Sequence, residues 1–172
     1  MRKLLLALGV MCVSSTVAAQ STQSSSSTTL VAVVETACKV ESTSSIQFGA
    51  YDPVNINRTL PARAQGSVSV QCSNGSTNVK MALSQGQNAL GSSNCTIPQR
   101  RMRSPQNNFL NYYIYQDNGE NIVWGCADES SKTLPTFSSL SRITVPTFGF
   151  VEAGQDVPQG IYIDTVEVVV TF

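Results

Sequence analysis

The sequence closes with the stretch Gly160-Ile-Tyr-Ile-Asp-Thr-Val-Glu-Val-Val-Val-Thr-Phe172. Apolar side chains occupy every second position in its second half, which is the period of a β-strand with one buried face. That face would carry Val166, Val168, Val170 and Phe172. An immunoglobulin-like sandwich has a further strand beside such an apolar strand, and no further strand follows in this sequence. We therefore expect one open edge in the fold.

A second alternating stretch lies near the opposite end and reads Thr28-Thr-Leu-Val-Ala-Val-Val-Glu-Thr36. One of its faces carries Thr28, Leu30, Ala32 and Val34. The stretch follows a run of serine, threonine and glutamine, a composition typical of a flexible tether. We expect residues 20–37 to form an extension that donates its strand to a neighbouring copy. The pattern alone fits a first strand of the chain's own domain about equally well.

The first residues have the three parts of a secretory signal peptide. Arg2 and Lys3 precede an apolar run over residues 4–13, and small residues follow up to Ala19. We predict cleavage after Ala19 and export of the chain, because the apolar run is too short to remain as a membrane span. Removal of residues 1–19 leaves nine basic against 11 acidic residues, a net charge of about −2. This charge is too small to attract nucleic acid or an anionic membrane.

Four cysteines remain in the exported chain, and in an oxidising compartment they predict two disulfide bonds. Three connectivities are possible, and we favour the sequential one, Cys38 with Cys72 and Cys95 with Cys126. Each bond would stabilise the fold by roughly 3–4 kcal/mol in the loop-closure model. A metal site is a poor alternative, because the chain has no histidine and no C-x-x-C motif.

Several short alternating segments separated by turn signals lie between the two stretches quoted above. The turn Asn74-Gly75 joins two of them, and Pro146 interrupts another, which predicts an edge or irregular strand there. No stretch has the period of a long amphipathic helix. About seven short strands held by disulfides predict an all-β, immunoglobulin-like β-sandwich over residues 38–172. The segments are 46–49, 66–72, 79–83, 109–115, 122–124, 143–151 and 160–172.

Catalysis has little support in the sequence. Without histidine, no Ser-His-Asp or Cys-His arrangement is possible. A pair of carboxylates for glycoside hydrolysis would need one raised pKa, and polar, turn-like surroundings do not raise it. We therefore predict no enzyme activity, no cofactor and no small-molecule substrate. The carboxylates considered are Asp117, Glu120, Asp128 and Glu129.

Two other clusters have an ordinary interpretation. Arg100, Arg101 and Arg103 form the only basic cluster, and we expect them to be solvated rather than to bind an anionic polymer. The aromatic residues of the middle of the chain resemble a surface for stacking on sugars, but their strand-like spacing places at least half of them in the core. They are Tyr112, Tyr113, Tyr115 and Trp124.

The order and spacing of several short motifs resemble the spore coat protein U domain family, which includes subunits of archaic, Csu-type chaperone–usher pili. The most specific motif is Pro158-x-Gly160-x-Tyr162-x-Asp164-Thr165-Val166, which leads into Phe172. The others are Cys38-x-Val40, Phe48-Gly49-x-Tyr51-Asp52-Pro53, Gly66-x-Val68-x-Val70-x-Cys72, Leu83-x-x-Gly86, Arg101-Met102, Leu110-Asn-Tyr-x-Ile-Tyr115-x-Asp117, Val123-Trp124-Gly125 and Gly154-Gln155.

The resemblance implies an incomplete immunoglobulin-like sandwich that lacks its last strand and exposes a hydrophobic groove. A periplasmic chaperone would lend a strand, and at the outer-membrane usher the extension of another pilus subunit would replace it. The strand with Val166, Val168, Val170 and Phe172 would border the groove and pair with the chaperone. The resulting fibre, an adhesive pilus on the cell surface, would support attachment and biofilm formation.

Two alternatives stay open from the sequence. The same domain fits a spore or cell coat protein whose role is self-association. It also fits a monomeric extracellular module that binds carbohydrate.

Overall fold

The computed structural model describes residues 29–139 and 141–172. It separates the chain into one unit up to Val33 and a second unit, Val34–Phe172. Residues 29–33 form no helix or strand, and the Leu30 and Val31 side chains are 93% and 81% exposed. The predicted signal peptide, residues 1–19, and Thr28 of the predicted donor strand lie outside the described residues.

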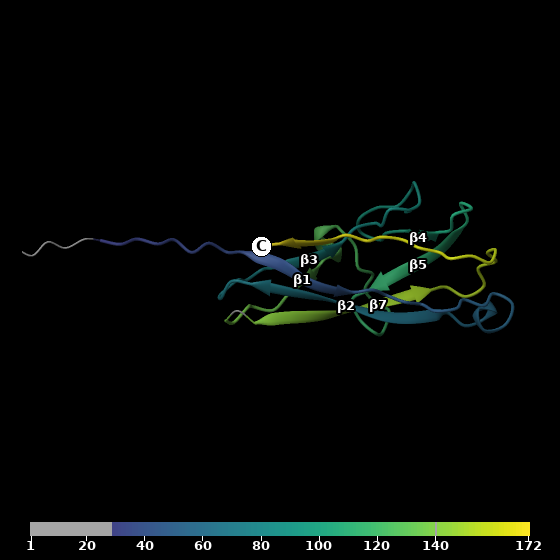
Figure 1. The fold of residues 1–172 in the computed structure, drawn as a ribbon, viewed down its shortest axis with the longest axis horizontal. Coiled ribbons are helices and arrows are strands. Elements are labelled where there is room, and N and C mark those ends of the chain that lie inside the picture. The colour runs from purple at the N-terminus through teal and green to yellow at the C-terminus, as the bar shows by residue number, and fades with distance from the viewer. Residues whose placement is uncertain (1–28, 140) are drawn as a thin grey trace, which may run out of the picture. The chain divides into compact units, whose positions relative to one another are not determined.

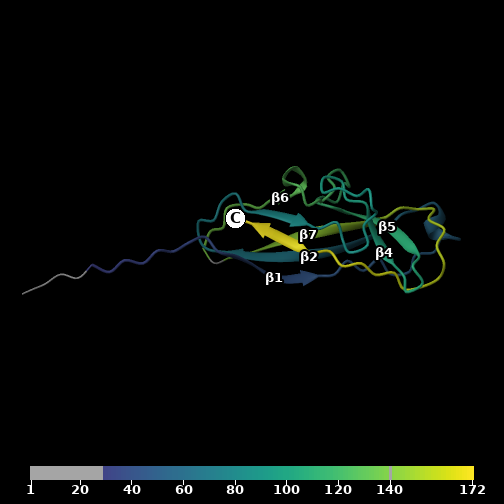
Figure 2. The same cartoon turned by 90° about the horizontal axis from the view of Figure 1, so that it is seen from above.

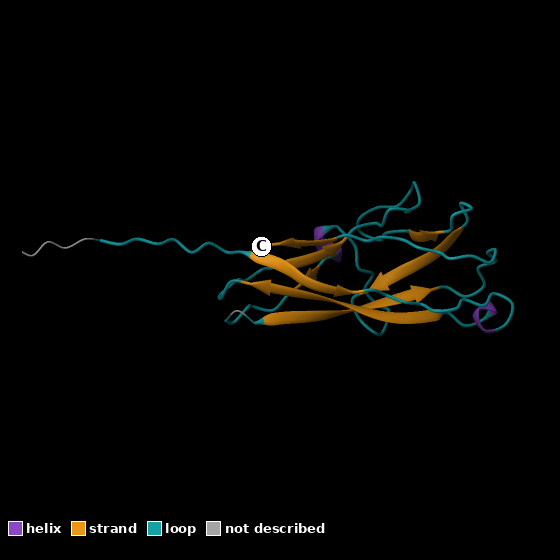
Figure 3. Cartoon of the chain, in the orientation of Figure 1, coloured by secondary structure: helices purple, strands orange, loops and turns teal. Residues whose placement is uncertain are grey.

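The regular secondary structure of the second unit consists almost entirely of β-strands joined by long loops, which confirms the all-β class (Figure 3). Two single 3₁₀ turns, η1 (Ile56–Arg58) and η2 (Asp128–Ser130), are its helical elements among the described residues. The strands are β1 (Cys38–Ser44), β2 (Ala62–Cys72), β3 (Lys80–Leu83), β4 (Arg100–Arg103), β5 (Phe109–Tyr115), β6 (Lys132–Thr133), β7 (Arg142–Val151) and β8 (Val168–Thr171).

The strands form two antiparallel sheets, shown from two directions in Figures 1 and 2. One sheet has the order β1-β2-β7-β5-β4, and the other has the order β6-β3-β8. The first sheet is centred on the long pairing of β2 with β7, which runs from Ala62 opposite Val151 to Gln71 opposite Arg142. Strand β1 is therefore an edge of the first sheet, and β8 is an edge of the second.

Two disulfide bonds fasten the sandwich. Cys38 is bonded to Cys72 and Cys95 to Cys126, the two pairs that the sequence analysis favours. The first bond joins opposed residues of β1 and β2, so it holds the edge strand at the point where it begins.

The core lies between the sheets and is filled by alternate residues of the strands, as period-2 burial requires. Its largest fully buried side chain is Trp124, whose indole Nε1 donates a hydrogen bond of 2.9 Å to the carbonyl of Met81. Its buried apolar members are Val68, Val70, Cys72, Val79, Met81, Leu83, Leu110, Tyr112, Ile114, Trp124, Leu134, Phe137, Val145 and Val151.

Pro146, from which the sequence analysis predicts an edge or irregular strand, lies in β7, an internal strand of the first sheet. The registers give the reason. Ser67 of β2 lies opposite Pro146, whereas β5 pairs with β7 only at residues 148–150. The proline thus occupies a part of β7 that has one neighbouring strand, which is the edge-like position in which a sheet tolerates proline.

The chain after β1 turns inward and passes over the inner face of the first sheet. Ile46 and Phe48 pack against the core there. The close approach depends on Gly149 of β7, because a Cβ at this position would lie 2.5 Å from Ile46 and 2.7 Å from Phe48. This packing places residues 43–48 beside the edge of the sandwich.

The predicted long strand over residues 160–172 is shorter in the structure. Strand β8 covers Val168–Thr171 and pairs with β3, while an isolated bridge joins Ile163 to Arg103 at the end of β4. The segment passes from one sheet to the other over this distance, so it does not stay paired with a single strand. Its side chains still alternate between the inside and the outside from Tyr162 to Val170.

Candidate functional site

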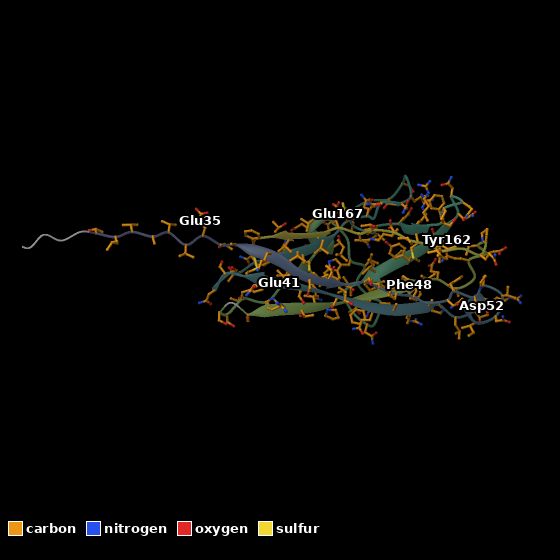
Figure 4. All side chains as sticks on the ribbon, in the orientation of Figure 1. Glu35, Glu41, Phe48, Asp52, Tyr162 and Glu167 are labelled. Atoms are coloured by element: carbon orange, nitrogen blue, oxygen red, sulfur yellow. A yellow bond between two sulfur atoms is a disulfide. The ribbon has the colours of Figure 1, made fainter. Side chains whose placement is uncertain are left out.

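An open groove with a cavity volume of about 430 Å³ runs along the edge of the sandwich. Residues 43–48 form one side, and the segment 162–168 forms the other. Figure 4 labels Phe48 and Tyr162, one from each side. Its floor consists of core side chains from both sheets, namely Val68, Leu83, Met102, Tyr112 and Ile114.

The groove lies where the two sheets approach each other without joining. Strands β1 and β8 run side by side there (Figure 1). Among the described residues, β1 pairs with β2 and β8 pairs with β3, and no ladder connects β1 to β8. The sandwich is thus incomplete along this seam, in agreement with the expected open edge.

The segment beside the groove uses only one of its two main-chain edges. Ile163 exchanges hydrogen bonds of 2.9 and 3.1 Å with Arg103, and the carbonyls of Thr165 and Glu167 accept from Gln87 and Ser84. In an antiparallel strand, successive residues direct their main-chain groups to opposite edges. The intervening residues 164, 166 and 168 therefore direct their N–H and C=O groups toward the groove. An unpaired edge of this kind is a template for another strand.

The side chains of the predicted groove-edge strand divide into three groups. Val166 and Val168 line the groove. Val170 packs against the core beyond the groove. Phe172, which was expected on the same buried face, is instead 56% exposed, because it follows the last residue of β8 and no described element covers it.

A partly buried polar network lies beside the apolar lining. The hydroxyl of Tyr112 donates a hydrogen bond of 2.7 Å to Asp164. The other carboxylate oxygen of Asp164 accepts from the main-chain N–H of Gln87 at 3.0 Å and from both nitrogens of Asn88. Burial, and then the hydrogen bond to Asp164, raise the pKa of Tyr112 far above its ordinary value. The network fixes the groove-edge segment to the floor and to the loop after β3.

Arg100 is fully buried beside this network and is not the solvated residue that the sequence analysis expected. Its Nε and Nη2 donate hydrogen bonds of 2.9 and 2.6 Å to the carbonyl of Ser84, and Nη2 also donates to Leu83. Burial lowers the pKa of Arg100 to about 10, although Tyr112 and Asp164 act in the opposite direction. Arg100 therefore remains charged at neutral pH and holds the end of β3 against β4.

The other two arginines of the basic cluster also have local partners. Arg101 donates to the carbonyls of Asn88 and Ala89, at 3.0 and 3.2 Å, and its guanidinium lies 4.1 Å from the ring centroid of Phe109. Arg103 donates to the side chain of Asn107. The cluster thus organises loops and offers no continuous basic surface.

The aromatic residues of the middle of the chain lie on opposite sides of the sheet. Tyr112 and Trp124 are buried, in agreement with the prediction that at least half of the group is core. Tyr113 and Tyr115 lie on the outer face with ring centroids 6.1 Å apart, and Tyr115 also packs edge-on against Phe150. Both are partly covered.

The carboxylates considered for catalysis form separate surface interactions. Asp128 pairs with Lys80 at 2.5 Å, and Glu120 pairs with Arg63. Hydrogen bonds, the largest from Asn121, lower the pKa of Asp117, which is the opposite of what a general acid needs. The described residues contain no group of three or more metal-binding side chains. Among them we also find no helix with the length and apolarity that crossing a membrane requires.

Sequence reasoning did not find two parts of this site. It treated residues 46–49 as a short strand, although Ile46 and Phe48 form one side of the groove. It also gave no role to Asp164. A signal for Asp164 was present, since it is the one acidic position on the face that also carries Val166 and Val168.

Comparisons with known proteins agree with this architecture. A family model described as "Spore Coat Protein U domain" matches residues 22–169. Protein U of Myxococcus xanthus is 38% identical over 130 residues, which cover 74% of this chain and 71% of that protein. A crystal structure of the CsuC–CsuE chaperone–tip adhesion subunit pre-assembly complex, from archaic chaperone–usher Csu pili of Acinetobacter baumannii, has a similar fold. The match has a TM-score of 0.57 and 23% sequence identity, and it covers 81% of this chain and 40% of that chain.

Proposed function

The chain belongs to the spore coat protein U domain family, and from this premise we propose that it is a structural subunit of a chaperone–usher pilus. The observation that carries the proposal is the groove between residues 43–48 and 162–168, with its unpaired main-chain edge. Such an edge above an apolar floor fits a strand supplied by another chain, the recognition mode of pilin complementation.

The donated strand comes, in this proposal, from residues 20–37 of a neighbouring copy. Thr28, Leu30, Ala32 and Val34 would enter the groove, and we call this set the donor face. Burial of a few hundred Å² of apolar surface would stabilise the pair by roughly 5–10 kcal/mol, before the cost of ordering the extension. Removal of the strand would expose the core again, so dissociation would be slow.

Export and assembly follow the route that the family resemblance implies. Residues 1–19 act as a signal peptide that directs the chain to the periplasm, and residues 38–172 fold there as the pilin domain. A periplasmic chaperone first fills the groove, and the outer-membrane usher then exchanges the chaperone strand for the extension of the next subunit. The partner in the similar Csu structure is a chaperone, which supports the first of these two steps. The fibre serves surface attachment and biofilm formation, and no enzymatic step is involved.

Deletion of residues 21–34 tests the donor assignment. The truncated subunit retains its groove, so it should form a complex with the chaperone but should not enter a fibre as a donor. A matched control deletes only residues 21–27, which shortens the tether and leaves the donor face intact. Size-exclusion chromatography of the periplasmic fraction and electron microscopy of sheared fibres measure the two outcomes. Full-length fibres from the 21–34 deletion would refute the proposal.

A coat protein that assembles by self-association is the second candidate function. It is favoured by the match to the family model described as "Spore Coat Protein U domain", together with the 38% identity to Protein U of Myxococcus xanthus. The two candidates differ in their need for a chaperone, since a coat protein that assembles unaided should polymerise after refolding alone. A purified domain that stays folded and monomeric would instead favour the carbohydrate-binding module.

A further inference from the structure

The outer face of the first sheet carries a group of aromatic side chains that has no part in the groove. Tyr113 of β5 lies opposite Phe150 of β7, and Tyr115 lies opposite Phe148. Opposed residues of antiparallel strands share one face of the sheet, and the intervening residues of both strands are buried. The four rings therefore lie on the side away from the second sheet, and we call them the outer aromatic block.

An open hollow with a volume of about 270 Å³ lies at one border of this block. Its lining combines one aromatic ring, Phe148, with the polar side chains of Arg63, Gln65, Asn118 and Glu120. Gln65 of β2 lies directly opposite Phe148. Gln65 and Asn118 are exposed, and their side-chain amides have no hydrogen-bond partner within the described residues. Both amides are therefore free to bind a polar ligand.

The other two polar side chains of the hollow form a pair. Arg63 donates through Nη2 to Glu120 at 3.1 Å, and its Nε donates to the second carboxylate oxygen. The guanidinium also lies 5.2 Å from the ring centroid of Phe150. A guanidinium and a carboxylate paired in this way present donors and acceptors in one plane. The Arg63 side chain is 57% exposed, so the pair can be reached from solvent.

We propose that the hollow binds one sugar unit of a neutral polysaccharide, with the outer aromatic block as the stacking surface. The C–H face of a pyranose ring packs on an aromatic ring, and its hydroxyls exchange hydrogen bonds with amides, carboxylates and guanidinium groups. The volume is just below the roughly 300 Å³ at which ligand pockets begin, so it suits a single sugar ring. Neighbouring units of the polysaccharide would lie over Tyr113 and Tyr115.

The local charge favours a neutral polymer over an acidic one. Burial, and then the charge of Glu120, raise the pKa of Tyr115, and Glu152 and Asp117 act in the same direction. Three carboxylates thus surround this part of the block, whereas Arg63 is the one cation in the lining of the hollow. Their combined field repels uronic acid polymers and nucleic acid.

The size of the block favours a polysaccharide over a protein partner. The block and the hollow cover three neighbouring strands, which span about 10 Å at the usual strand spacing. A stable protein contact buries about 800 Å² on each partner, far more than this width offers. The site lies outside the groove, so it does not depend on the proposed function and stays open in a monomer and in a fibre.

The test is affinity electrophoresis of the full exported chain in native gels. The probes are three neutral polysaccharides, a β-glucan, a galactomannan and dextran, and one acidic polysaccharide, alginate. The amide variant is Gln65→Ala with Asn118→Ala, and the stacking variant is Phe148→Ala. Phe109→Ala is the matched control, because Phe109 is a partly exposed ring of β5 that lies outside the hollow. Circular dichroism verifies that each variant is folded.

At least one neutral polysaccharide should retard the native chain and the control, and alginate should not. The amide and stacking variants should each raise the dissociation constant roughly 5- to 100-fold. The amide variant keeps the test decisive if Phe148→Ala does not fold, since both of its side chains are exposed. Absence of retardation by every neutral polysaccharide, retardation by alginate alone, or unchanged binding in the amide variant overturns the site. A loss of fibre bundling in the amide variant without any polysaccharide binding would assign this face to a contact between copies and also overturn it.

Discussion

Tyr112 on the floor of the groove donates a hydrogen bond of 2.7 Å to Asp164 on its border. This bond ties the segment between the Ile163 bridge and β8 to the first sheet, because Tyr112 belongs to β5 and Asp164 precedes β8. Main-chain and side-chain donors of Gln87 and Asn88 complete the coordination of the carboxylate. These bonds therefore fix one side of the groove to its floor and to the loop after β3 before any strand enters it.

Tyr112→Phe should lower the free energy of unfolding of the isolated domain by about 1.5–3 kcal/mol, the range for a hydrogen bond to a charged group. The ring stays in place, so the loss comes from the hydroxyl alone. Tyr113→Phe is the matched control, because this hydroxyl makes no hydrogen bond within the described residues. Urea denaturation measures both variants. Equal midpoints for the two would show that the bond does not hold the groove together.

Arg100→Met should destabilise the domain by about 2–4 kcal/mol, because it leaves the buried carbonyls of Ser84 and Leu83 without their donor. Arg103→Met is the control, since Arg103 has one exposed side-chain partner and should change stability by less than about 0.5 kcal/mol. Thermal unfolding monitored by circular dichroism distinguishes them. An unchanged unfolding temperature for Arg100→Met would mean that the hydrogen bonds of the guanidinium do not stabilise the domain.

Acid should destabilise the domain through carboxylates whose pKa is lowered in the fold. The pKa of Asp52 is lowered by hydrogen bonds, the largest from the side chain of Asn55, and the pKa of Asp117 is lowered chiefly by Asn121. A lowered pKa means that the unfolded chain binds more protons between the two values. The stabilisation is therefore complete above about pH 4 and is lost as pH falls through the folded pKa.

Asp52→Asn tests the contribution of one carboxylate to this loss of stability at low pH. Asparagine keeps an oxygen that can accept from the main-chain N–H groups of Val54 and Asn55, which Asp52 now binds at 3.0 Å, but it does not titrate. The variant should lose part of the slope of stability against pH below about pH 4. Urea midpoints collected from pH 2 to pH 7 measure this slope. If the slope of stability against pH is the same in the variant, carboxylates other than Asp52 account for the loss of stability in acid.

Loss of the Cys38–Cys72 bond should lower the yield of exported protein sharply. The bond fixes the first residue of β1 to the end of β2, and its removal should cost about 2–5 kcal/mol. The double variant Cys38→Ser, Cys72→Ser avoids a free thiol and is compared with Cys95→Ser, Cys126→Ser. Peptide mapping of the native protein checks the connectivity. A peptide that links Cys38 to Cys95 would disagree with the structure.

The sequence predicts the features that depend on local period and composition. Alternation identified the strands around Val68–Cys72 and Phe109–Tyr115, and the apolar face of Val166 and Val168. The groove itself depends on which sheet edges lie next to each other. The two edge strands, β1 and β8, stand at opposite ends of the domain in the sequence, so local patterns do not predict that they meet. The burial of Arg100 was missed for the same reason, since the carbonyls that accept its hydrogen bonds lie at the end of β3, which only the fold brings close. The position of the strand with Pro146 also depends on the fold, because β5 pairs with β7 only at residues 148–150 and leaves Pro146 with β2 as its one neighbouring strand.

The central claim is that a strand from another copy completes the seam between β1 and segment 162–168. The most direct measurement is a cryo-electron microscopy map of the native fibre at a resolution that separates strands. We predict a continuous strand in the groove, with Leu30, Ala32 and Val34 facing Val166 and Val168, traceable to the N-terminus of the neighbouring subunit. An empty groove, or one filled by the subunit's own residues 28–34, would contradict the claim.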